Sequence, residues 1–395
     1  MKVGWQIKPL GEFCDILDNL RKPITKSVRT QGIYPYYGAT GILDYVEGFL
    51  FDEALVLVGE DGAKWASGQN TAFPVIGKCW VNNHAHVLRP HRDKVIDKWL
   101  INYLVHSDLS EFVSGLTVPK LNQGNLRVIP IPIPSVQEQQ RIVAILDQAF
   151  EGIAKARANA EQNLQNARAL FESHLQSVFS VRPELVEGRG EGWMKNKLGS
   201  LTTKIGSGAT PRGGGESYKA EGISLVRSLN VHDFGFKYAK LAFLDDAQAK
   251  ELSNVELKSN DVLLNITGAS VARCCIVPED VLPARVNQHV SIIRPIAEKL
   301  DSSFLHYLLL SKPYKDKLLQ TGSEGGSTRQ AITKAQIQEF LIEYPPAIED
   351  QKAIAHKLNE MLKETQRLET LYQRKIALLD ELKKSLLQQA FAGEL

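Results

Sequence analysis

The 395-residue chain is predicted to have an α+β fold, in which two β-rich mixed domains are each followed by a long helix. The sequence repeats itself once, which predicts a pseudo-two-fold internal repeat. Each repeat ends in about 40 residues of heptad spacing without an internal proline, which predicts a helix of roughly 60 Å. Between the shared landmarks the two repeats differ strongly, so each repeat combines a divergent globular part with a repeated helical part.

The repeat is carried by matched segments that occur in the same order. The distance between matched residues grows from 188 at Trp5 and Trp193 to 212 at Pro134 and Pro346, so the second repeat has 24 additional residues in its front part. Such a layout suits two recognition heads for different targets on one common frame. The matched pairs are "WQIKPLGEF" (5–13) with "WMKNKLGSL" (193–201), "NNHAHVLRP" (82–90) with "NQHVSIIRP" (287–295), and "PSVQEQQRIVAIL" (134–146) with "PAIEDQKAIAHKL" (346–358).

The front parts contain short apolar runs of strand length, bounded by Gly, Asn or Pro. Helical spacing occurs at equivalent places in the two repeats, at 97–107 and 302–312. "VIPIPIPS" (128–135) is predicted to be an extended connector and not a central strand, because proline has no amide donor. The predicted strands are "ALVLVG" (54–59), "HVLRP" (86–90), "DVLLNI" (261–266) and "VSIIRP" (290–295).

Each long helix has one apolar stripe, and a lone helix of this kind needs its stripe covered. The two stripes are therefore predicted to cover each other as a coiled coil. Ser135, followed three residues later by Glu138, is a predicted helix cap. The predicted boundaries are 1–134 for the first domain, 135–180 for the first long helix, 181–192 for a Gly- and Pro-containing linker, 193–346 for the second domain and 347–395 for the second long helix.

Composition favours a soluble protein of the cytoplasm. No apolar run approaches the roughly 18 residues of a membrane span, and four cysteines without a CxxC pair suggest neither a zinc site nor a disulfide framework. The net charge is +2, and residues 1–136 and 193–348 carry 14 basic against 13 acidic and 19 against 16 side chains. Charge therefore permits nucleic-acid binding without demonstrating it.

The sequence contains no recognisable motif of an amino-methyltransferase, a phosphate-loop enzyme or a metal-dependent nuclease. "EYPPA" (343–347) is not the Asn/Asp-Pro-Pro-aromatic motif of amino-methyltransferases, and "GSGATPRGGG" (206–215) lacks the Lys-Ser/Thr ending of a phosphate loop. Glu60, Asp61 and Lys64 supply the residue types of a metal-dependent nuclease, but one turn after an apolar strand they are interpreted as a strand end. No catalytic residue, metal or cofactor is predicted.

The chain resembles the specificity subunit of type I restriction-modification systems over about residues 3–395. The resemblance is strongest at "GLTVPKLNQGNLRVIPIPIPSVQEQQRIVAILD" (115–147), its counterpart "GSTRQAITKAQIQEFLIEYPPAIEDQKAIAHKL" (326–358) and the closing "LLQQAFAGEL" (386–395). It implies two target-recognition domains, each reading one half of a split, asymmetric DNA sequence, and antiparallel helices that hold them apart. It also implies partners: double-stranded DNA, two DNA adenine methyltransferase subunits, and restriction and translocase subunits. A coiled-coil scaffold for other proteins, without DNA recognition, is the alternative.

Candidates for DNA contact come from the loops ahead of the connectors, at 114–125 and 322–334, and from Gly-rich turns. Arg and Lys suit guanine or phosphate, and Asn and Gln suit adenine. Ordinary solvated turns contain the same residue types, and Tyr36 serves equally well to close a hairpin. For His84 and His289, which match between repeats, a structural hydrogen bond is expected. The candidates are Tyr36, Lys64, Gln69, Lys120, Asn122 and Gln123 in the first domain and Arg212, Arg227, Ser327, Thr328, Arg329 and Gln330 in the second.

Overall fold

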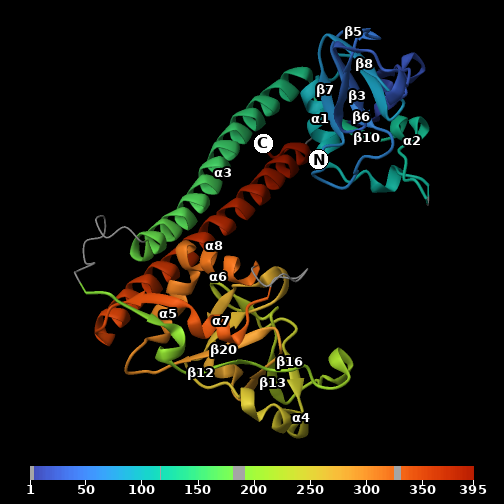
Figure 1. Cartoon of the computed structure of the whole chain (residues 1–395). Helices are drawn as coiled ribbons and strands as arrows, with labels where there is room; N and C mark the ends of the chain where they lie inside the picture. The colour runs from blue at the N-terminus through green and yellow to red at the C-terminus, as the bar shows by residue number, and fades with distance from the viewer. Residues whose placement is uncertain (1–3, 116, 181–191, 324–330) are drawn as a thin grey trace. The chain divides into compact units, whose positions relative to one another are not determined.

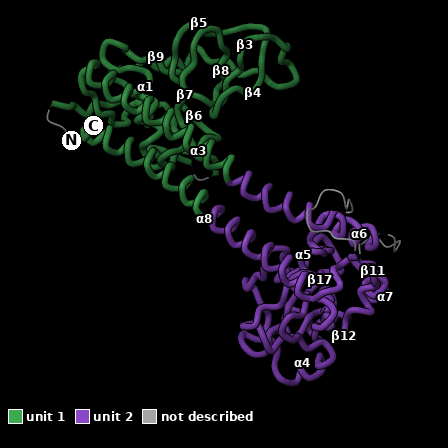
Figure 2. Tube along the Cα trace, turned by 90° about the vertical axis from the view of Figure 1, so that its left-hand side faces the viewer, with its two compact units in different colours: residues 1–163, 371–395 green, residues 164–370 purple. Residues whose placement is uncertain are grey.

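The computed structural model describes residues 4–115, 117–180, 192–323 and 331–395. The chain forms two compact units, Met1–Asn163 with Leu371–Leu395 and Leu164–Thr370 (Figure 2). The chain contains two long helices, α3 (Val136–Phe179) and α8 (Ile348–Ala392) (Figure 1). Each of them contributes residues to both units (Figure 2). The part of the first unit ahead of α3 is called the first head, and residues 192–347 of the second unit are called the second head.

The first head holds two four-stranded sheets, with strand orders β2-β9-β6-β7 and β4-β3-β8-β5, and a two-stranded sheet β1-β10. Its helices are α1 (Asp97–His106) and α2 (Gln123–Arg127). Its strands are β1 (Gln6–Pro9), β2 (Cys14–Ile16), β3 (Gln31–Gly38), β4 (Gly41–Val46), β5 (Phe51–Asp52), β6 (Leu55–Gly59), β7 (Ala72–Val75), β8 (Lys78–Val81), β9 (Ala85–Pro90) and β10 (Pro130–Ile133).

The second head holds a four-stranded sheet of order β12-β20-β17-β18, a three-stranded sheet β16-β13-β19, and the pairs β11-β21 and β14-β15. Its helices are α4 (Asp246–Glu251), α5 (Ser302–Leu310), α6 (Lys312–Ser323) and α7 (Lys334–Glu339). Its strands are β11 (Met194–Lys197), β12 (Thr202–Ser207), β13 (Ile223–Val226), β14 (Val231–His232), β15 (Gly235–Phe236), β16 (Ala242–Leu244), β17 (Val262–Asn265), β18 (Cys274–Ile276), β19 (Ala284–Val286), β20 (Val290–Pro295) and β21 (Leu341–Tyr344).

The central strand of each head is apolar on both faces because it separates two hydrophobic clusters. Along β6, Val56 and Val58 face the cluster that contains α1, whereas Leu55 and Leu57 face the cluster on the other side. Neighbouring side chains of a strand point to opposite faces, so a continuous apolar run is what this position requires. In the second head β17 is buried in the same way between two clusters. The four predicted strands are therefore confirmed.

The proline-rich connector forms β10, which pairs only with β1, so the prediction that it is no central strand is confirmed. The predicted helix 302–312 was wrong at its end. It stops at Leu310, where Ser311 adopts an extended conformation, and α6 begins as a separate helix at Lys312.

The two long helices run antiparallel. In the first unit the start of α3, at Ile142 and Leu146, shares a cluster with Leu387 and Phe391 near the end of α8. In the second unit the end of α3, including Phe171 and Leu175, shares a cluster with Leu358 near the start of α8. The small residues of the predicted stripe are buried where they face the partner, as at Ala160 and Ala167.

Two ion pairs between the helices fix one register. Arg157 pairs with Asp380 in the first unit, and Arg168 pairs with Glu369 at 2.7 Å in the second. Between the two ion pairs, α3 advances by eleven residues, from Arg157 to Arg168, and α8 goes back by eleven, from Asp380 to Glu369. The α+β fold with an antiparallel helical coiled coil is as predicted. The predicted cap is also present, since Glu138 N donates to Ser135 Oγ at 3.3 Å.

A buried glutamine joins each head to its long helix. Gln139 Oε1 accepts a hydrogen bond from Ile96 N, and Gln139 Nε2 donates to the carbonyl oxygens of Lys94 and Pro134, at 2.8–2.9 Å. Both side-chain groups are satisfied by backbone atoms of the head, so the first turn of α3 is fastened to it.

The second unit repeats this arrangement atom for atom. Gln351 accepts from Asp301 N and donates to the carbonyl oxygens of Lys299 and Pro345, at 2.8–3.0 Å. Both glutamine side chains are fully buried. The predicted linker 181–192 lies, except for Gly192, outside the described residues. Within the described ranges no helix has the combined length and hydropathy of a membrane span.

Candidate nucleic-acid interface

In the first head, the end of β6 meets the loop that precedes α2. Glu60 N donates to the His84 carbonyl at 2.9 Å, and Leu121 N donates to the Glu60 carbonyl at 2.8 Å. A β-bridge joins Asp61 to Lys120. The turn after β6, the segment ahead of β9 and the loop ahead of α2 therefore meet at one sheet edge.

The second head builds the same edge from its own sequence. Ile266 N donates to the His289 carbonyl at 3.0 Å, and Ile332 N donates to the Ile266 carbonyl at 2.8 Å. A β-bridge joins Thr267 to Ala331. The two loops thus occupy equivalent places, and the residue equivalent to Lys120 is Ala331.

The turns that form the two edges also match. Gly62 and Gly268 follow the strand at equivalent positions with φ of 69° and 77°, a left-handed conformation that glycine adopts without strain. The matched histidines make the expected structural hydrogen bonds. His84 Nδ1 lies 2.5 Å from Asp61 Oδ1, and His289 Nδ1 lies 2.5 Å from Thr267 Oγ1.

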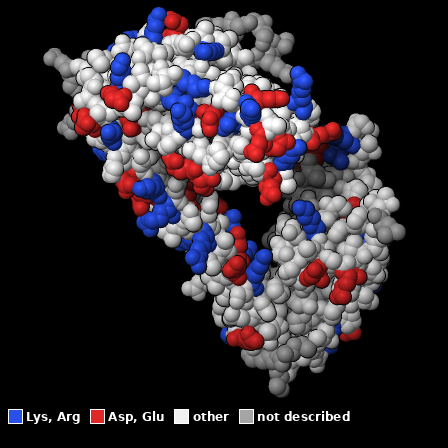
Figure 3. All heavy atoms as spheres, turned by 90° about the horizontal axis from the view of Figure 1, so that it is seen from below, with Lys and Arg blue, Asp and Glu red and all other residues white. Residues whose placement is uncertain are grey.

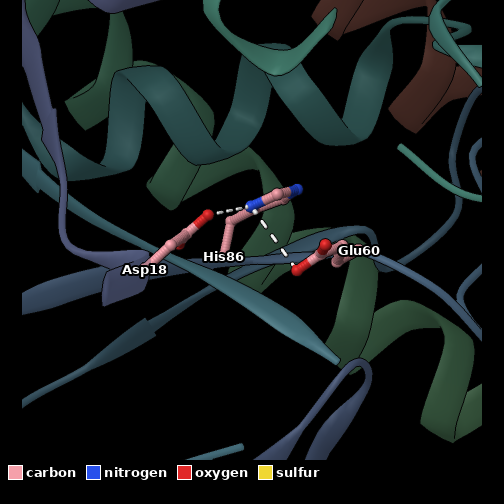
Figure 4. A group of neighbouring side chains, drawn as sticks. All are labelled: Asp18, Glu60 and His86. Atoms are coloured by element: carbon pink, nitrogen blue, oxygen red, sulfur yellow. Dashed lines mark hydrogen bonds and ion pairs between the residues drawn. The ribbon is translucent and has the colours of Figure 1, made fainter. Parts of the chain in front are cut away.

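A buried ion-pair network lies at the edge of the first head (Figure 4). His86 is fully buried, and its Nδ1 lies 2.6 Å from Asp18 Oδ2 and 3.8 Å from Glu60 Oε2. Its Nε2 donates to the Leu121 carbonyl at 2.7 Å. The ring thereby ties the strand β9 to the loop ahead of α2.

Basic and amide side chains complete the network. Lys120 Nζ pairs with Glu60 Oε1 at 2.8 Å, and Arg21 donates to Glu60 Oε2. Gln123 Nε2 donates to Asp18 Oδ2 at 3.2 Å. Two predicted contact residues, Lys120 and Gln123, are therefore held by acidic side chains that lie just after strands β6 and β2.

The pKa values of the two carboxyls follow from these partners. Burial raises the pKa of Glu60, but hydrogen bonds from Lys120 and Arg21 outweigh it and hold the pKa below its usual value. Burial likewise opposes the hydrogen bond from His86 at Asp18, whose pKa is lowered overall. The hydrogen bond to Glu60 raises the pKa of Lys120.

Asp18, Glu60 and His86 lie close enough together to hold a metal ion. Each of the four carboxylate oxygens, however, already accepts a hydrogen bond, from Val87 N, His86 and Gln123 at Asp18 and from Lys120 and Arg21 at Glu60. A cation would have to displace these donors. The geometry therefore favours an internal support for the loop over a metal centre.

The remaining candidates of the first head divide into surface and internal residues. Lys64 and Gln69 line a hollow of about 430 Å³ together with Pro119, next to Lys120. Asn122 caps α2, since its Oδ1 accepts from Asn125 N at 2.8 Å.

Tyr36 is 1% exposed, and its hydroxyl accepts from Ile24 N at 2.9 Å. The structure thus gives Tyr36 a structural role inside the head, and it is removed from the proposed interface. Its place on β3 in an apolar hairpin is the physical reason, because one face of this strand packs on the core.

In the second head Arg212 is exposed on a loop that Thr210 ties to Gln288, the neighbour of His289. Arg227 is engaged internally: its guanidinium lies 5.0 Å from the Tyr218 ring and donates to the Lys240 carbonyl. Ser327, Thr328, Arg329 and Gln330 lie outside the described residues.

Residues that sequence reasoning did not select complete both edges. In the first head these are Asp18, Arg21 and His86, and in the second a hollow of about 430 Å³ is lined by Thr267, Ser270, Arg273, His289 and their neighbours. A polar residue at a position of the strand that is expected to face the core, such as His86 in "AHVLRP", is the signal that was available. On the face shown in Figure 3, basic and acidic side chains are interspersed, in line with the net charge of +2.

Comparisons with known proteins agree with this architecture. The HsdS subunit from Thermoanaerobacter tengcongensis superimposes with a TM-score of 0.60 at 19% identity, covering 100% of this chain and 98% of that one. A chain from a structural study of complex assembly in a type I R-M system reaches a TM-score of 0.73 at 19% identity, covering 100% and 99%.

Sequence relatives give the same result. The Methanocaldococcus jannaschii type I restriction enzyme MjaVIII specificity subunit is 23% identical over 378 residues, which cover 90% of this chain and 86% of the relative. The Haemophilus influenzae protein S.HindORF215P, which carries the name of a type I restriction enzyme specificity subunit, is 42% identical over 147 residues, or 37% of either chain.

The model of the type I restriction modification DNA specificity domain matches twice, at residues 2–162 and 190–378. These two matches cover most of the chain and coincide with its two repeats. The chain therefore belongs to the family of type I restriction-modification specificity subunits.

Proposed function

We propose that this chain is the DNA-reading subunit of a type I restriction-modification enzyme and has no catalytic activity of its own. Each head reads one part of a split, asymmetric sequence, and the paired helices set the number of base pairs between the parts. We assign target recognition to residues 1–134 and 193–346, and the linker 181–192 connects the first long helix to the second of these domains.

One observation carries the proposal. The two heads build the same sheet edge with the same backbone hydrogen bonds, yet they place different side chains on it. Glu60 and Lys120 in the first head correspond to Ile266 and Ala331 in the second. A frame that is repeated while its side chains differ is suited to two different targets, because base edges are distinguished by donor and acceptor patterns.

The long helices also supply a surface for partner subunits. On α8, Leu371, Leu378 and Leu382 are 47–52% exposed and follow one another by seven and four residues, so they share one face. Large apolar side chains grouped on one helix face favour a protein partner. We propose that two adenine methyltransferase subunits dock on the helices and that restriction and translocase subunits join through them.

The first prediction is that this chain directs adenine methylation to a two-part sequence. The chain is co-expressed with its methyltransferase partner in a host without other adenine methylation, and methylated adenines are mapped across the genome. The expected result is two short blocks separated by a constant gap. A chimaera with residues 193–346 replaced by those of a relative should change one block and leave the other unchanged.

One uninterrupted methylated block would contradict the two-head assignment. Methylation that does not depend on this chain, in a complex that nevertheless assembles, would favour the scaffold function instead.

A further inference from the structure

The second head contains a positively charged hollow that the proposed function does not yet use. It lies at the sheet edge described above, between the turn after β17 and the segment that precedes β20. Its volume is about 430 Å³, and its polar lining consists of Ser228, Thr267, Ser270, Arg273 and His289. Within the lining no carboxylate side chain is present, so an anion is not repelled there.

Arg273 is the cation of this hollow. It is half-buried, and among the described residues no acidic side chain lies within ion-pair distance of it. Two other arginines of the second head are paired with carboxylates: Arg294 with Asp261 at 2.7 Å and Arg285 with Glu256 at 3.5 Å. A half-buried guanidinium without a counter-ion has lost hydration that a bound anion would replace.

Asn265 prepares the hollow for an acceptor ligand. This side chain is fully buried, and its Nδ2 donates to the Ser228 carbonyl at 2.9 Å and to Ser270 Oγ at 3.1 Å. Because Ser270 Oγ accepts this bond, its own hydrogen is available for a ligand. Asn265 N also donates to the Arg273 carbonyl at 2.8 Å, so one residue holds both the hydroxyl and the arginine in place.

The small residues of the turn allow a ligand to approach the backbone. Gly268 has φ of 77° with nothing within 4 Å of its missing Cβ, and Ala269 follows it on the rim. A hollow of hydroxyls, small residues and one arginine fits a protruding tetrahedral anion. Base edges lie on the groove floor and are reached by protruding side chains, whereas phosphates project from the duplex.

We infer that this hollow binds one phosphate of the DNA backbone beside the second half-site, with Arg273 and Ser270 as its ligands and Asn265 as a positioning residue. This inference rests on the proposed function. The contact fixes the register of the second head on the duplex and contributes no sequence preference of its own.

The test uses the complex of the full-length chain with its methyltransferase partner and a duplex that carries the mapped methylation site. Its dissociation constant is measured from 50 to 200 mM salt for the native chain and for Arg273→Gln. Each phosphate contact contributes about 0.9 to the slope of log affinity against log salt. The slope for Arg273→Gln should fall by about 0.9, so its affinity deficit at 50 mM should be about 3.5-fold larger than at 200 mM.

Sequence preference provides the second readout. The ratio of affinities for the native site and for a site altered in its second half should be the same in both proteins. Arg273→Lys should restore the slope, and Ser270→Ala should weaken binding severalfold while leaving the slope unchanged. Lys299→Gln, which removes the same charge at the opposite end of β20, is the matched control and should keep the native slope.

An unchanged slope for Arg273→Gln would overturn the inference. A reduced preference for the second half-site would also overturn it, since Arg273 would then read a base. If the native complex itself fails to prefer the mapped site, the proposed function fails, independently of Arg273.

Discussion

Lys120 shows how a single residue can hold part of the fold together and still be accessible to the DNA of the proposed interface. Its ammonium pairs with Glu60, but its side chain remains 44% exposed, while that of Glu60 is only 9% exposed. Arg21 also donates to Glu60 Oε2, so the buried carboxylate keeps a cationic partner when another ligand engages Lys120. In the proposed interface, a DNA phosphate can therefore compete for the exposed ammonium.

Lys120→Ala should weaken binding of the complex with the methyltransferase partner to its methylation site about fivefold, since it removes one cation from the proposed interface. The matched control is Lys94→Ala. Lys94 lies beyond the other end of β9, and only its carbonyl takes part in the contact with Gln139. Both affinities are measured by fluorescence anisotropy at one salt concentration. Equal affinities for Lys120→Ala and the native chain would remove this loop from the interface.

The sequence predicted some of these residues and missed others for a physical reason. Lys120 and Gln123 lie in a polar loop, where the amino-acid types alone suggest DNA contact. Asp18 lies 105 residues from Gln123, and β-sheet pairing brings the two side chains together. Contacts of this kind depend on strand register, which local sequence does not encode.

At the scale of elements, the two buried glutamines determine how each head is attached to its helix. Gln139 and Gln351 make equivalent bonds to backbone atoms, so the attachment is independent of the side chains that differ between heads. Replacing one by an apolar residue would leave one buried and two partly buried backbone groups without partners. A buried group of this kind costs about 1–3 kcal/mol, and groups that water can still reach cost less.

Gln139→Leu should accordingly lower the free energy of unfolding by about 2–4 kcal/mol. Denaturant titration of the full-length chain, followed by tryptophan fluorescence, measures the change, because Trp99 lies in the cluster next to this contact. Gln148→Leu, at an exposed position of the same helix, is the control and should change the stability little. Equal stability of the two variants would mean that the glutamine does not fasten the head.

The helices and strands were the features of this protein that the sequence predicted best. The long helices follow from apolar spacing without proline, and the buried strands follow from short apolar runs. The break at Ser311 was missed because Lys312 starts a new helix at once, so that helical spacing continues across the join.

At the scale of the whole molecule, the ion pairs between α3 and α8 couple the lengths of the two helices. The two paired arginines, Arg157 and Arg168, are eleven residues apart on α3, and their partners Asp380 and Glu369 are eleven residues apart on α8. A change of length in one helix therefore has to be matched in the other. This requirement makes the proposed spacing of the half-sites testable.

Seven residues inserted between Arg157 and Arg168, together with seven between Glu369 and Asp380, would lengthen the pair by about 10.5 Å while keeping the apolar stripe in phase. At about 3.4 Å per base pair, the methylated gap should lengthen by about three base pairs. Methylation mapping measures the gap. The insertion in α3 alone is the control. It should abolish methylation, since the two ion pairs can then no longer form at the same time. An unchanged gap in the doubly extended chain would exclude the helices as the spacer.

The bonds shared by the two sheet edges are made by main-chain atoms, which all amino acids possess. Mutation can therefore rewrite the side chains at either edge without dismantling the edge itself, as Glu60 and Ile266 already illustrate. If each head reads its own part of the sequence, as proposed, one head can change its target while the other head keeps its own.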